Sequence, residues 1–92
     1  MSYFEVTSRE VRTRASNLQE LNSRFKFLES ELETREGALT SMWEGEARTL
    51  FHNAFCADKN QMDAFSQLVG NYVEALLEIA RRYEEAERQA SE

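Results

Sequence analysis

The sequence predicts an all-α protein, a long antiparallel helix-turn-helix hairpin that dimerises into a four-helix bundle. Three observations support this fold: apolar residues recur at intervals of three, four and seven, no proline interrupts them, and a glycine lies near the midpoint of the 92 residues. Apolar residues at this period form a stripe along one side of an α-helix. A central glycine lets the chain reverse between two such helices.

A capping box predicts where the first helix begins. Thr7 and Glu10 have the spacing at which each side chain bonds to the other residue's backbone N–H, so we expect a helix over about 8–41. An equally spaced pair, Ser2 and Glu5, allows an earlier start. The apolar seam of this helix comprises Val11, Leu18, Phe25, Leu28, Leu32 and Leu39. Heptad spacing of this kind is typical of long helices that pack side by side.

The bend is expected at about 42–45, around Trp43 and Gly45. Glycine adopts a positive φ at little cost, which allows a tight change of direction. The tryptophan offers a large apolar surface that can close this end of the helix pair.

The second helix is expected over about 46–88. Glu44 and Glu46 place negative charge near its positive N-terminal end. The polar run at 58–61 predicts a kink, a fray or a solvent-facing patch. The seam of this helix comprises Phe51, Phe55, Phe65, Tyr72 and Leu76.

Residues 1–92 are expected to form one domain, because two glycines besides the one at the bend and no proline leave no linker. The apolar stripes are wider than one line of contact between two rods can cover, so a second hairpin is the natural cover. Basic residues gather in the first half of the first helix and acidic residues in the second half: Arg9, Arg12 and Arg14 against Glu29, Glu31, Glu33 and Glu36. An antiparallel pair of identical chains sets these halves against each other.

Several classes of function are excluded by composition. A net charge of −6 without a dense basic cluster disfavours nucleic acid and anionic membranes as partners. There is no apolar run long enough for a membrane span, and no basic-then-apolar start typical of a cleaved signal peptide. No nucleophile lies in a pattern with a base, so we expect no enzyme, no catalytic residue and no cofactor.

His52 and Cys56 are four residues apart, a spacing that can place two metal ligands on one side of a helix. The chain has no other histidine or cysteine to complete a site, so we expect no metal. The structural alternative is a half-buried histidine and a small buried thiol.

Four features together resemble one known family. They are Trp43-Glu44-Gly45 at the midpoint, a length near one hundred residues, two long amphipathic helices, and Tyr83 followed four residues later by Glu87. The sequence resembles the WXG family, the small helical-hairpin substrates of the type VII (ESX) secretion system. On the matching positions, Trp43 and Gly45 take the role of the bend motif, and Tyr83 and Glu87 that of the export signal. Glu87 is expected to have no structural task of its own.

The resemblance implies a protein made in the cytoplasm and secreted without a cleaved signal peptide, as a folded dimer, through the type VII secretion ATPase. Its partner is a second copy, as a homodimer, or a paralogous WXG protein, as a heterodimer. Three functions stay open: a secreted protein with a role in virulence or host interaction, a helper that targets a larger type VII toxin, and an intracellular four-helix scaffold. In an antiparallel dimer the bend motif of one chain would meet the export signal of the other.

Overall fold

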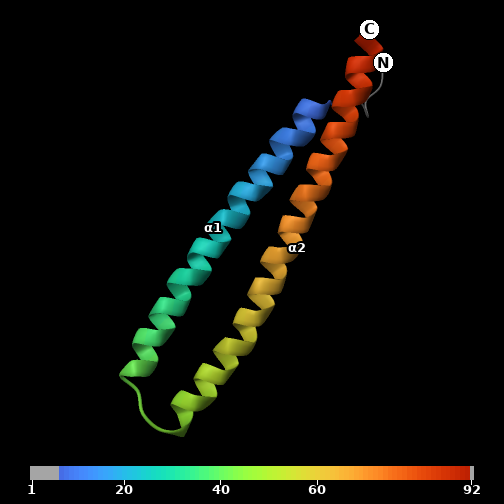
Figure 1. The fold of residues 1–92 in the computed structure, drawn as a ribbon. Helices are drawn as coiled ribbons and strands as arrows, with labels where there is room; N and C mark the ends of the chain where they lie inside the picture. The colour runs from blue at the N-terminus through green and yellow to red at the C-terminus, as the bar shows by residue number, and fades with distance from the viewer. Residues whose placement is uncertain (1–6, 92) are drawn as a thin grey trace.

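The computed structural model describes residues 7–91, which form a hairpin of two long antiparallel helices. α1 (Ser8–Ser41) and α2 (Glu46–Ser91) run side by side, with the bend at one end and the start of α1 beside the end of α2 at the other (Figure 1). The rod has extents of 71 × 21 × 16 Å. The predicted all-α hairpin is confirmed, and its dimerisation stays a prediction.

α1 begins at a complete capping box. Thr7 is the N-cap with an extended backbone (φ −84°, ψ 157°), and its Oγ1 accepts a hydrogen bond of 3.1 Å from the Glu10 N–H. Glu10 completes the capping box, because its Oε2 accepts a hydrogen bond from the Thr7 N–H at 3.3 Å. The alternative start at Ser2 and Glu5 lies outside the described residues.

The chain leaves α1 through a short turn and enters α2 after Gly45. The N–H groups of Met42 and Trp43 still donate to the last turn of α1, and Gly45 has a φ of +106°. Arg48, in the first turn of α2, donates from Nε to the Thr40 carbonyl at 2.6 Å. A cation is favourable there because the C-terminal end of a helix carries partial negative charge. The two helices are therefore joined at the bend by a hydrogen bond as well as by the chain.

α2 is a single helix through the polar run at 58–61, so the expected fray is absent. Asp58, Asn60 and Gln61 are exposed, which agrees with a solvent-facing patch. Lys59 differs from its neighbours, because it turns toward α1 and pairs with carboxylates there. α2 continues to Ser91, three residues beyond the expected end at about 88.

The buried residues at the contact between α1 and α2 are small or polar. The apolar members are Val11, Ala15, Val69, Val73 and Ala80. The polar members are Ser8, Asn22, Glu29, Glu36, Thr40 and Ser66. Within the described residues no large side chain is completely buried. The hairpin alone therefore buries little of the apolar surface that the sequence carries.

The residues of the predicted seam lie at different depths. Val11 is buried, and four others are half-buried: Leu18, Phe25, Phe55 and Leu76. The remaining six are exposed: Leu28, Leu32, Leu39, Phe51, Phe65 and Tyr72. Their heptad spacing places them beside the line of contact between the two helices, where a second hairpin could cover them.

Candidate functional site

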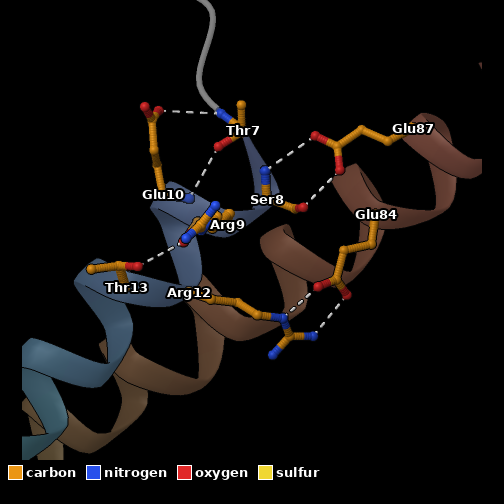
Figure 2. Close-up of polar contacts among 8 residues, drawn as sticks. All are labelled: Thr7, Ser8, Arg9, Glu10, Arg12, Thr13, Glu84 and Glu87. Carbon is orange, nitrogen blue, oxygen red and sulfur yellow. Dashed lines mark hydrogen bonds and ion pairs between the residues drawn. The ribbon is translucent and has the colours of Figure 1, made fainter.

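The first turns of α1 meet the last turns of α2 through four polar side chains, which we call the terminal clamp: Ser8, Arg12, Glu84 and Glu87 (Figure 2). The Ser8 hydroxyl donates to Oε1 of Glu87 at 2.7 Å, and the Ser8 N–H donates to Oε2 at 3.3 Å. Ser8 is buried, with 7% of its surface exposed. Both oxygens of the Glu87 carboxylate are thus bonded to one residue of the other helix.

The position of Glu87 over the start of α1 has a simple physical cause. The first N–H groups of a helix have no partner within the helix, and they carry partial positive charge. Ser8 is the first residue of α1, so its N–H is one of these groups. A carboxylate from α2 satisfies it and is stabilised by the helix dipole.

Arg12 and Glu84 form the second half of the terminal clamp, one turn further from the helix ends. The guanidinium donates from Nε to Oε2 of Glu84 at 2.5 Å and from Nη2 to Oε1 at 2.8 Å. Two parallel bonds of this kind fix the orientation of both groups. The hydrogen bond from Arg12, aided by its charge, lowers the pKa of Glu84 below its usual value.

The sequence-predicted export pair, Tyr83 and Glu87, lies on consecutive turns near the end of α2. Tyr83 is 42% exposed, and Glu87 is also exposed, although its carboxylate is bonded to Ser8. The expectation that Glu87 has no structural task is therefore wrong. The signal that could have revealed the task is the capping box itself, because it places Ser8 at the end of a helix whose antiparallel partner ends near Glu87.

The bend pair, Trp43 and Gly45, lies at the opposite end of the hairpin (Figure 1). Trp43 is half-buried, and its ring centroid is 5.9 Å from that of Phe51 with the planes inclined by 43°. The tryptophan therefore packs on the first turns of α2. Within one chain the bend pair and the export pair are separated by the length of the rod.

Between these ends the two helices are joined by polar pairs, which we call the polar seam: Asn22 with Ser66, Glu29 with Lys59 and Asp63, and Glu36 with His52. Asn22 donates from Nδ2 to the Ser66 carbonyl at 3.1 Å, and the Ser66 hydroxyl donates to Asn22 Oδ1 at 3.0 Å. Every buried side-chain nitrogen and oxygen of the described residues has a partner. The polar seam is therefore a set of specific bonds that fix the register of α1 on α2.

Lys59 is the centre of the ionic part of the polar seam. Its Nζ lies 3.2 Å from Glu33, 3.2 Å from Asp63 and 3.7 Å from Glu29. A hydrogen bond between the carboxyl groups of Glu29 and Asp63, together with burial, raises the pKa of Glu29. The same bond and the hydrogen bond from Lys59 lower the pKa of Asp63. One lysine thus holds three acidic groups from two helices together.

His52 and Cys56 do not form a metal site with other residues of the described chain. His52 Nδ1 lies 2.7 Å from Glu36 Oε1, and Cys56 Sγ lies 3.6 Å from His52 Nε2. Within residues 7–91 no group of three potential ligands occurs. Both residues are exposed, so the expected half-buried histidine and buried thiol are wrong.

One side of the hairpin carries large apolar side chains that nothing in the described chain covers. We call this surface the apolar face; its members are 41–61% exposed, and they are Leu28, Leu32, Leu39, Phe65, Tyr72 and Ile79. Phe25 of α1 and Phe65 of α2 touch there, with ring centroids 5.4 Å apart. Both helices therefore contribute to one continuous apolar surface.

The fold and the bend define a class, the small helical hairpins with a Trp-x-Gly turn between two long helices. The chain belongs to the WXG100 family, proteins of 100 residues with WXG, whose model matches residues 4–88. Proteins of this family are known to form dimers and are not known as enzymes. No helix of residues 7–91 is long and apolar enough to cross a membrane.

Solved structures with the same fold include EsxB, a secreted protein from Bacillus anthracis str. Sterne. A selenomethionine-labelled form is 20% identical to this chain with a TM-score of 0.84, over 95% of this chain and 99% of that one. The wild-type protein in another crystal has the same identity and a TM-score of 0.82 over 90% and 89% of the two chains. A point mutant of EsxB matches with a TM-score of 0.84 over 92% and 96%. Among curated proteins none matches this chain significantly.

Proposed function

We propose that this protein is a substrate of a type VII (ESX) secretion system, exported as a folded dimer and recognised through Tyr83 near the end of α2. The observation that carries the proposal is the placement of the export pair. Tyr83 and Glu87 stand one turn apart near the end of a helix that the terminal clamp fixes on α1, in a chain of the WXG100 family. The similarity to EsxB, a secreted protein, supports the same function.

The partner in the dimer is a second copy of this chain. The apolar face supports this, because six large side chains on it are substantially exposed and a second hairpin buries them. An antiparallel arrangement also sets the basic first half of α1 against the acidic second half of the other copy. The bend of one protomer then lies beside the terminal clamp of its partner.

This arrangement gives the secretion ATPase a recognition surface that forms only on assembly. Trp43 and Gly45 of one protomer would lie close to Tyr83 of the partner subunit, although the two motifs are far apart in one chain. Outside the cell, the exported dimer acts on a host. Export and assembly are therefore expected to be lost together when the apolar face is changed.

Export is tested by the amount of protein in the growth medium beside the amount in the cells. Tyr83→Ala should remain in the cells, while Tyr83→Phe, which keeps the ring, and Glu85→Gln, which changes a charge outside the terminal clamp, should be exported. Circular dichroism of each purified variant checks that the helices are intact. A folded Tyr83→Ala protein that reaches the medium like the wild type would refute the proposal.

Assembly is tested by light scattering. The wild type should have twice the 10.7 kDa mass of one chain, and Leu32→Glu should have the mass of a single chain. Ser30→Glu is the matched control, because residue 30 lies about 200° round the helix from Leu32 and lines a polar groove. A wild-type mass of one chain at tens of micromolar would rule out the homodimer.

A further inference from the structure

Glu87 is exposed, and both oxygens of its carboxylate accept hydrogen bonds from Ser8 in the folded hairpin. Oε1 accepts from the Ser8 hydroxyl at 2.7 Å and Oε2 from the Ser8 N–H at 3.3 Å. Hydrogen bonds to an ionised carboxylate are stronger than those between neutral groups, and the N-terminal end of α1 adds a favourable dipole. A receptor that reads Glu87 directly must share the carboxylate with Ser8, which already holds it in one orientation. A receptor that reads Tyr83 meets a ring that is already partly exposed.

We propose that Ser8 is a positioning residue for export: it holds Glu87, so that the acidic residue of the export signal acts by fixing the last turns of α2 on α1 and the secretion machinery contacts Tyr83. This inference rests on the proposed export function. It gives the Tyr-x-x-x-Glu pair two different tasks, recognition for the tyrosine and attachment for the glutamate.

The second pair of the terminal clamp supports this division of tasks. Glu84 follows Tyr83 directly, and its carboxylate is held by both Nε and Nη2 of Arg12. Tyr83 thus lies beside one point of attachment to α1 and one turn before the other. Attachment through both Glu84 and Glu87 prevents the end of α2 from rotating or fraying, so the Tyr83 ring is held in one orientation. The first turn of α1 is required for this, so the export signal is complete only in the folded hairpin.

Ser8→Pro is the sharpest test, because it removes both donors to Glu87 and leaves the helix start intact. Ser8 is the first residue of α1, where proline is favoured because that N–H has no partner within the helix. Thr7 has φ −84° and ψ 157°, a conformation that suits the residue before a proline. The Thr7–Glu10 capping box does not involve Ser8.

Export of Ser8→Pro and of Glu87→Gln should each fall about tenfold or more, as expected when charge-assisted bonds that hold a docked segment are lost. Adding Glu87→Gln to Ser8→Pro should cause no further loss, because Ser8→Pro already removes both bonds that Glu87→Gln weakens. Ser8→Thr, which keeps the hydroxyl and the N–H, should be exported like the wild type. Hydrogen exchange of the α2 amides from residue 83 onward should accelerate in Ser8→Pro and Glu87→Gln alike.

A matched control separates positioning from general stability. Ser66→Ala weakens the hairpin in the middle of the polar seam, far from the terminal clamp, but keeps the bond from Asn22 Nδ2 to the Ser66 carbonyl that fixes the register. It should therefore be exported normally even where its melting temperature is as low as that of Ser8→Pro. Equal loss of export in Ser66→Ala at equal melting temperature would overturn the inference, because stability alone would then explain the effect.

The remaining outcomes are also decisive. Normal export of Ser8→Pro together with blocked export of Glu87→Gln would show that the machinery reads Glu87 directly, which overturns the inference and leaves the proposed function standing. Normal export of both Tyr83→Ala and Glu87→Gln would refute the proposed function itself. The two failures are therefore distinguished within one set of strains.

Discussion

The reciprocal bond between Asn22 and Ser66 leads to a prediction that the structure makes quantitative. Ser66→Ala removes the donor to Asn22 Oδ1 and leaves the second bond in place, because that bond is accepted by the Ser66 backbone carbonyl. Both residues are buried, with 9% and 5% of their surfaces exposed, so water cannot replace the lost donor freely. A buried acceptor without a partner costs about 1–3 kcal/mol.

Part of this cost is offset by the better helix propensity of alanine, about 0.5 kcal/mol. The net loss of unfolding free energy is therefore about 0.5–2.5 kcal/mol. For a chain of this size the melting temperature should fall by roughly 2–20 °C. Thermal unfolding followed by circular dichroism measures it, with Ser16→Ala, an exposed serine on α1, as the matched control.

The double variant Asn22→Leu with Ser66→Ala tests the reasoning more severely. It removes both polar partners together, and an apolar pair of similar size in a buried site is close to neutral or stabilising. The double variant should therefore melt above Ser66→Ala alone. A Ser66→Ala protein that melts like Ser16→Ala, or a double variant less stable than the single one, would contradict the assignment of this bond as a buried contact.

Three further predictions concern other parts of the hairpin. Glu84→Gln should lower the melting temperature at pH 7 but not near pH 2. The pKa of Glu84 is lowered in the folded state, so its bond to Arg12 stabilises the fold at pH values above the usual carboxyl pKa. This stabilisation is lost as the pH falls through the lowered pKa of the folded state. An equal loss of melting temperature at both pH values would argue against a stabilising bond between Glu84 and Arg12. Gly45→Ala should cost about 1–3 kcal/mol, because a φ of +106° strains any side chain although the space around it is open, and urea unfolding would measure this. Leu32→Ala should cost about 2–5 kcal/mol in the dimer, and Phe25→Ala likewise, so melts that scarcely move for both would place the dimer contact elsewhere.

The start of α1 and the glycine at the bend could be read from the sequence because local chemistry determines them. Thr7 and Glu10 bond to each other within one turn, so their spacing alone indicates the start of α1. Gly45 is the only residue of the described chain with a positive φ, and a glycine is the residue that this conformation favours. Neither feature depends on what the other helix does.

The line of contact between the helices could not be read in the same way. Apolar periodicity predicts which side of a helix is covered, but it does not say whether the cover is the other helix of the chain or a second molecule. Here the hairpin contact includes Asn22, Glu29, Glu36 and Ser66, while Leu28 stays exposed. Buried polar residues of this kind are hard to recognise from the sequence, because each depends on one particular hydrogen-bonding partner on the other helix.

The bonds of the polar seam also determine whether the terminal clamp can close. Ser8 and Glu87 meet only if α1 and α2 lie in one register, and a slip of one helical turn moves the carboxylate by about 5.4 Å, too far for either bond. Apolar packing between small residues such as Ala15 and Ala80 resists such a slip weakly, because neighbouring positions offer similar surfaces. The Asn22–Ser66 pair resists it strongly, since a slipped Asn22 would be buried without its partners. A core that combines small apolar residues with polar pairs is thus the arrangement that holds Tyr83 and Glu87 in place at the far end of the rod.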